Sequence, residues 1–196
     1  IVVDDCCNEE IKNFCGENVE ANTGNNAIIA KQDGVAQVST TGRVSVYAIE
    51  PYQNISKSHG SVVRDHSMLI ERDILSGAVL DTPATVIVRG AIRGANVEIG
   101  GDLDCQVGLD NRNKGEEGVA IVGGSLRCAQ IRGFKVWAGS KVLVHRLIDQ
   151  SEIECLDTLA CPRVGDSTVA VGNRLIAYNV VRDSTLRFGP DAVKDP

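Results

Sequence analysis

A nine-residue pattern that occurs five times between residues 97 and 177 constrains the fold more than any other feature of the sequence. Each copy alternates apolar and polar residues, usually breaks at glycine, and then resumes with a second apolar run. The copies begin at Val97, Ala120, Val136, Ile153 and Val169, so that successive copies are 23, 16, 17 and 16 residues apart. This period is too short for a repeated helical hairpin, and it matches one coil of a parallel β-solenoid.

The alternation predicts which side chains fill the interior, because every second side chain of a strand points to the same face. Positions one, three and seven of the copies are apolar throughout: Val97, Ala120, Val136, Ile153 and Val169, then Ile99, Val122, Ala138, Cys155 and Val171, then Leu103, Leu126, Val142, Leu159 and Leu175. Glycine occupies the expected corner at residues 100, 123, 139 and 172, and Leu156 interrupts that column. A further apolar column at Ile131, Leu147, Val164 and Val180 predicts another wall of the coil.

The pattern places a parallel β-helix with a C-terminal cap at residues 80–196, with at least five coils. An earlier coil is expected at residues 80–88, which lie 17 positions ahead of the first clear copy. Residues 1–60 are expected to form a small β-rich or α+β domain, with a weak helical signal at residues 4–14 and short strands after residue 26. Residues 51–60 are the best linker candidate, and residues 61–79 are expected to be an irregular bridge. Pro190 and the charged residues after it are expected to protect the last strand edge.

Composition narrows the classes of function. The formal net charge is −6 and the isoelectric point is near 5.1, which disfavours general binding to nucleic acid or anionic lipid. No apolar run approaches the roughly 18 residues of a membrane span. Because the first residue is Ile1, the sequence is expected to be a segment or a processed form.

The seven cysteines predict a reducing compartment, hence the cytoplasm. Three of them, Cys105, Cys128 and Cys161, share one inward column, where a free thiol behaves as a small apolar side chain. Cys105 and Cys128 would also be near enough for a disulfide in an oxidising medium. The remaining cysteines Cys6, Cys7 and Cys15 lack the spacing of a zinc site and receive no role, so neither a metal nor a cofactor is expected.

The stretch Val86-Ile87-Val88-Arg89-Gly90-Ala91-Ile92-Arg93-Gly94-Ala95-Asn96-Val97-Glu98-Ile99-Gly100-Gly101-Asp102-Leu103 resembles the repeat region of the flagellar assembly protein A family. The resemblance covers roughly residues 80–185, and residues 31–35 and 42–46 resemble the segment that precedes the repeats. It implies a right-handed β-helix behind a small β-rich domain, and a non-enzymatic role in flagellar assembly and placement. The G-G-D repeat is also similar to the C-terminal domain of the cell-division inhibitor of the Min system and to the bactofilins. A Min-type regulator and a polymer-forming protein therefore remain alternatives.

Candidate binding residues come from the outward positions. Ile121 and Trp137 are expected to be stacked neighbours on a solvent face, unless another part of the chain covers them, and an exposed tryptophan can anchor a protein partner. Arg146 and Arg163 are expected to stack on one outward face near Arg132, where an acidic partner could bind. The expected partner is a protein, such as flagellar or cell-pole machinery, and self-association through the solenoid ends is an alternative.

A polysaccharide-acting enzyme is the alternative from a different class, since such enzymes also use parallel β-helices. Catalysis would need several ionisable groups that converge on one face. The outward columns instead mix charge signs, and His59, His66 and His145 are scattered. The cluster of Asp65, His66 and Asp73 is interpreted as a solvated loop. No catalytic residues are predicted.

Overall fold

The structure, a computed structural model, describes residues 10–39, 41–112 and 118–193. The chain forms two compact units, residues 1–50 and residues 51–196. Each unit has a hydrophobic core of its own.

The N-terminal unit contains a short 3-10 helix, η1 (Glu10–Phe14), and the strands β1 (Val19–Asn22), β2 (Ala27–Ala30), β3 (Val35–Val38) and β4 (Val44–Tyr47). β1 pairs with β2 and β3 with β4, both antiparallel. Its buried core consists of Ile11, Val19, Ile28, Val44 and Val46. The expected strands after residue 26 are present, and β1 is an additional one. Of the expected helix at residues 4–14, only the last five residues are described, and they are 3-10 rather than α-helical.

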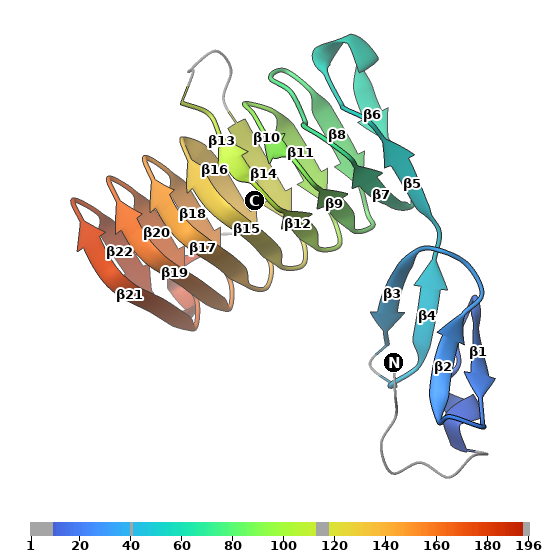
Figure 1. The fold of residues 1–196 in the computed structure, drawn as a ribbon. Coiled ribbons are helices and arrows are strands. Elements are labelled where there is room, and N and C mark those ends of the chain that lie inside the picture. Colours follow the sequence, from blue (N-terminus) through green and yellow to red (C-terminus); the bar gives the residue numbers. More distant parts are fainter. Residues whose placement is uncertain (1–9, 40, 113–117, 194–196) are drawn as a thin grey trace. The chain divides into compact units, whose positions relative to one another are not determined.

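The C-terminal unit is a right-handed parallel β-helix (Figure 1). One wall is an eight-stranded sheet of β6 (Ser61–Val63), β8 (Val79–Thr82), β11 (Asn96–Ile99), β14 (Gly118–Val122), β16 (Phe134–Ala138), β18 (Glu152–Cys155), β20 (Thr168–Val171) and β22 (Thr185–Phe188). Each strand between β6 and β22 pairs in parallel with the strand one coil earlier and the strand one coil later. We call this wall the eight-stranded sheet.

The other walls belong to a ten-stranded sheet that bends around the coil. Its main path is β5 (Ile49–Tyr52), β7 (Ser67–Ile70), β9 (Val86–Val88), β12 (Leu103–Cys105), β15 (Leu126–Arg132), β17 (Val142–Asp149), β19 (Thr158–Gly165) and β21 (Arg174–Arg182). The short strands β10 (Ala91–Ile92) and β13 (Gly108–Asp110) continue it beside β15. Two further 3-10 turns, η2 (Lys57–His59) and η3 (Pro190–Ala192), complete the described elements.

The predicted inward columns are the core of this unit. Val97 pairs with Ala120, which pairs with Val136, and the same register continues through Ile153 and Val169. The members of this column are at most 4% exposed. Stacking of like side chains on adjacent coils therefore creates one continuous apolar interior, which no coil could bury alone.

The solenoid begins earlier than predicted. Val62 pairs in register with Leu80, and Met68 pairs with Val86, so residues 61–79 form part of a coil instead of an irregular bridge. Ile55, within the expected linker, is fully buried in the same core. The boundary between the units lies at residues 50 and 51 rather than near 60. These first coils lack the corner glycine that later coils have at residues 100, 123, 139 and 172, which explains why the repeat pattern missed them.

One predicted column has the wrong register. Ile131 pairs with Ile148, Ile148 with Val164, and Val164 with Val181, so Ile148 and Val181 occupy the positions assigned to Leu147 and Val180. The cause is a set of β-bulges, because the pairing shifts between Cys128 and Gln130 and again between Leu143 and Ile148. An extra residue in a bulge moves every later side chain of the strand to the opposite face.

The chain leaves the coil path after β22. The N–H of Gly189 still donates to the carbonyl of Val171 at 3.1 Å, but Pro190 has no N–H with which to continue that ladder. η3 then contacts β20 and β22, and Val193 is 9% exposed. The described part of the cap therefore packs against β20 as well as against the last strand, β22. The charged residues expected to protect the edge at Lys194 and Asp195 lie outside the described residues.

Candidate functional site

The outer face of the eight-stranded sheet carries the predicted pair of exposed apolar residues. Ile121 on β14 pairs in register with Trp137 on β16, and Glu98 and Glu154 are the next residues of the row on either side. Ile121 and Trp137 are both partly exposed, as is Glu154 beside them, and Lys135 is exposed. Trp137 is the only tryptophan of the chain. The structure therefore places these two residues side by side on an outer face, as predicted.

The indole of Trp137 extends toward the glycine corner. A Cβ atom at Gly139 would lie 3.3 Å from its Cη2 atom. In the next coil Leu156 occupies this corner, because its N–H donates to the carbonyl of Ala138 at 3.0 Å, and its side chain is 40% exposed. We call Ile121, Trp137 and Leu156 the Trp137 patch. Leu156 was not predicted as a contact residue, although its interruption of the glycine column was the available signal.

The apolar row does not continue past Glu154. Ala170 follows Glu154 in register and was expected on the outer face, but it is only 3% exposed. The contact of η3 with β20 and the burial of Val193 account for this, since the cap lies over that part of the sheet. The Trp137 patch is therefore bordered on one side by the chain's own C-terminal cap.

The predicted arginine pair does not stack. Val164 pairs with Ile148, so Leu147, and not Arg146, is in register with Arg163. Arg146 lies in the bulge of β17 between Leu143 and Ile148, and both arginines are exposed. Arg132 pairs with Asp149, an acidic residue, so the expected basic stripe is interrupted. Arg132 is only partly exposed, and it lines a depression of about 350 Å³ together with Arg163, Arg182 and Asp149. An acidic partner at this face remains a prediction.

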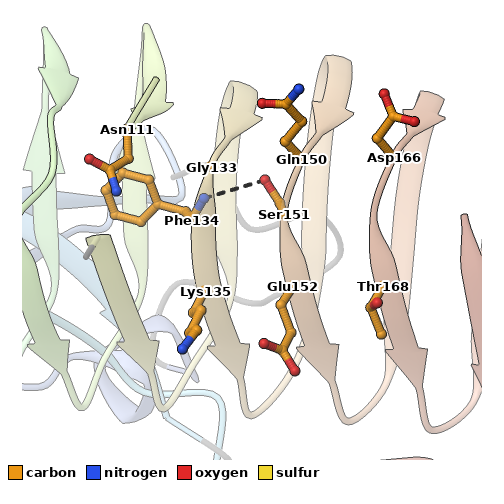
Figure 2. Close-up of a pocket in the computed structure, with 9 residues that line it drawn as sticks. All are labelled: Asn111, Gly133, Phe134, Lys135, Gln150, Ser151, Glu152, Asp166 and Thr168. Carbon is orange, nitrogen blue, oxygen red and sulfur yellow. Dashed lines mark hydrogen bonds between the residues drawn. The ribbon is translucent and has the colours of Figure 1, made fainter. Parts of the chain in front are cut away.

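A shallow depression of about 490 Å³ lies at another corner of the coils, at the level of β16 to β20 (Figure 2). Outward side chains and corner residues of successive coils line it: Asn111, Gly133, Phe134, Lys135, Gln150, Ser151, Glu152, Asp166 and Thr168. Gln150 and Asp166 have positive φ angles of 48° and 45°, as the tight corner requires. One cation and two carboxylates from adjacent coils meet here, so the depression resembles an ordinary charged surface more than a built site.

The serines beside this depression are structural. The N–H of Phe134 donates to Ser151 Oγ at 3.4 Å, and the N–H of Ser151 donates to Ser167 Oγ at 3.1 Å. Each hydroxyl in turn donates to the carbonyl oxygen two residues earlier. The distance is 2.7 Å from Ser151 Oγ to the carbonyl oxygen of Asp149, and 2.6 Å from Ser167 Oγ to that of Gly165. Both serine hydroxyl groups thus donate and accept hydrogen bonds that hold the coils together, so neither serine is placed as a nucleophile.

The buried thiols are equally unsuited to catalysis. Burial raises the pKa of Cys105 to about 12 and that of Cys155 to about 11, and it raises the pKa values of Cys128 and Cys161 as well. The described cysteines are free, although Cys105 and Cys128 are neighbours in register. A thiol that stays protonated at neutral pH is a poor nucleophile and a poor metal ligand. Cys6 and Cys7 lie outside the described residues.

The ionisable loop residues do not form a catalytic group. His66 hydrogen-bonds to the carboxylate of Asp65 at 2.9 Å, which lowers the pKa of Asp65, and both are exposed to solvent. Asp73 is used elsewhere, since it accepts from the N–H of Ala91 at 2.7 Å and from Arg93 at 3.4 Å. Within residues 10–39, 41–112 and 118–193, no group of three or more His, Cys, Asp or Glu side chains could hold a metal ion. No helix in that part of the chain has the length and apolar character to cross a membrane.

Comparison with known proteins agrees with this architecture. The model of the flagellar assembly protein A β-solenoid domain matches residues 45–184. This range begins within β4 and extends to the residue before β22, so it covers almost the entire β-helix. Neither a curated protein nor a solved structure matches.

Proposed function

Because the chain belongs to the flagellar assembly protein A β-solenoid domain family, we propose that it is a non-enzymatic assembly protein that binds a protein partner through the Trp137 patch. The observation that carries this proposal is the register of Ile121 beside Trp137 on an outer sheet face, with Leu156 exposed in the next coil. A parallel β-solenoid gives such a patch a rigid base, since each strand is hydrogen-bonded on both sides. A preformed apolar surface loses little conformational entropy when a partner binds.

A partly exposed tryptophan on an outer sheet face is suited to an anchoring role. Aromatic residues near the centre of an interface carry a large share of its binding energy, and loss of such an anchor costs about 2 kcal/mol or more. That corresponds to a roughly 30-fold weaker complex. Glu98 and Glu154 flank the patch in register, so they would form the polar rim that surrounds an apolar centre.

The alternative of a polysaccharide-acting enzyme has less support. The described ionisable groups near the surface depression have mixed signs, the serines are committed to backbone hydrogen bonds, and the described buried thiols are protonated. A catalytic role would need a base beside a nucleophile.

The proposal is tested by genetic complementation in a flagellated bacterium that encodes this chain. We expect deletion to reduce the number of flagella, and we expect Trp137→Ala and Ile121→Asp to fail to restore it while remaining folded. Val63→Asp is the matched control, since Val63 is a β-branched residue in the same outward row, 58% exposed, near the start of the solenoid. Full restoration by both patch variants would refute the docking site, and normal flagella after deletion would refute the assembly role.

A further inference from the structure

The C-terminal end of the solenoid leaves its apolar core open. Val181 continues the column of Ile131, Ile148 and Val164, which are 0–2% exposed, yet Val181 is 43% exposed. Phe188 likewise pairs with the fully buried Val171 but is 59% exposed. Among the described residues no strand pairs with the outer edge of β21 or β22.

The described part of the cap leaves Tyr178, Val181 and Phe188 exposed. η3 turns back onto β20, where it accounts for the burial of Ala170 and Val193. Tyr178, at the bend of β21, is 68% exposed. The backbone N–H and C=O groups along the outer edge of β21 are thus left available to a further strand, which is the usual condition for edge-to-edge association.

The terminal coil has an approximate two-fold symmetry of its own. The bend of β21 lies at Tyr178 and Asn179, where the pairing with β19 shifts register. The middle of β22 lies at Leu186, eight residues further along the chain. One coil here is 17 residues, as the pairing of Val169 with Leu186 shows, so these two points are half a coil apart. A two-fold axis through both points passes through the middle of β21 and the middle of β22. Rotation about this axis exchanges the two ends of each strand and so reverses its direction.

We propose that this end binds the same end of a second copy of the chain, as a two-fold symmetric dimer. Under that symmetry β21 of each copy lies antiparallel to β21 of the other, and β22 to β22, so that the free edge groups can pair. Tyr178 and Leu186 then meet their own counterparts near the axis, and Leu175 of one copy faces Val181 of the other. This single contact covers the open core at the C-terminal end of each copy.

Charged residues at the ends of β21 also meet across this contact. Arg174 and Arg182 are each four residues from Tyr178, so the symmetry places Arg174 of one copy opposite Arg182 of the other. Arg182 is already hydrogen-bonded to Asp183 at 2.9 Å. Two guanidinium groups that face each other repel, and Asp183, which would lie next to both, offsets this repulsion by bridging the two copies. The same ion pair forms twice, once on each side of the axis.

The contact is small, which sets the expected affinity. β21 and β22 provide nine and four residues, whereas a standard interface uses about 20–30 residues on each side. We therefore expect a reversible dimer with a dissociation constant in the micromolar range or weaker. Because the contact is isologous, association stops at two copies.

Analytical ultracentrifugation of the 196-residue chain from about 1 μM to 1 mM tests the proposal. We expect a monomer–dimer equilibrium, with a dissociation constant raised at least tenfold by Val181→Lys and, in a separate protein, by Phe188→Lys. Val63→Lys is the control, since this exposed valine lies in the first coils, and it should leave the constant unchanged; circular dichroism establishes that all three variants are folded. Asp183→Asn, which keeps the backbone and size, should weaken the dimer by a smaller factor.

Three outcomes would overturn the inference. A monomer at 1 mM means that the end does not bind a second copy. If the dimer tolerates both lysine substitutions, its interface lies elsewhere on the molecule. An interface at the Trp137 patch, for example, would be weakened by Trp137→Ala. Species that grow beyond a dimer with concentration are incompatible with a closed two-fold contact.

Discussion

Replacement of Leu126 by alanine tests the stacked-column account of stability most sharply. Leu126 is fully buried on β15, and its register partners on the two adjacent coils are Leu103 and Val142. Leu→Ala removes three carbons, worth about 2.4 kcal/mol at roughly 0.8 kcal/mol each. The cavity left between two hydrogen-bonded coils can collapse only partly, so the expected loss of unfolding free energy is about 3–4 kcal/mol, inside the usual range for this substitution.

The matched control is the neighbouring residue. Arg127 points outward, its side chain is 59% exposed, and its guanidinium lies 3.5 Å from the carboxylate of Asp104. A solvent-exposed pair of this kind contributes little, so Arg127→Ala should cost less than about 0.5 kcal/mol. Urea unfolding followed by circular dichroism measures both values, with m-values compared to establish that the unfolded states are similar. Equal losses for the two variants would refute the assignment of inward and outward positions.

Three further predictions concern the thiols and one ion pair. A thiol reagent should label Cys105, Cys128 and Cys161 far more slowly in native protein than in urea, and equal rates would contradict their burial. Burial raises the folded-state pKa of Cys105 to about 12, so the buried thiol contributes fully to stability below its ordinary pKa of about 9, and this contribution is lost as pH rises toward 12. Between pH 8 and pH 10.5, the free energy of unfolding should therefore fall less for Cys105→Val than for the native chain. The Arg112 guanidinium lowers the pKa of Asp110, so this carboxylate stabilises the fold above its unfolded-state pKa of about 4 and ceases to do so as pH falls through its lower folded-state pKa. Asp110→Asn should therefore lower the free energy of unfolding by up to about 1 kcal/mol at pH 7 and by nearly nothing at pH 2. An equal loss at both pH values would argue against the ion pair.

The regular coils were predictable because their physical requirement is repetitive. An inward position must be apolar in every coil, and a tight corner excludes side chains: a Cβ at Gly123 would lie 2.5 Å from the carbonyl oxygen of Gly100. Such constraints are written into each copy of the repeat. The predicted neighbours Ile121 and Trp137 followed from the same register.

The irregular features depend on contacts that the repeat does not encode. A bulge needs only one extra residue. Leu147 and Ile148 are consecutive and both apolar, so the repeat pattern could not show that Ile148 is the one in register with Ile131. Ala170 is buried by a cap that follows it by some twenty residues, which an alternation pattern cannot show. The predicted pairing of Arg146 with Arg163 was wrong for the same reason, because the bulge shifts the register of β17.

Site-specific photocrosslinking in living cells tests the central claim most directly, namely that the protein acts by docking a partner on the Trp137 patch. A photoreactive amino acid is placed at residue 121, beside Trp137, or at residue 63 in the same outward row of the first coils. We predict one discrete adduct with a heterologous protein from position 121, lost on Trp137→Ala, and no such adduct from position 63. Equal adducts from both positions, or an adduct from 121 that survives Trp137→Ala, would contradict the claim.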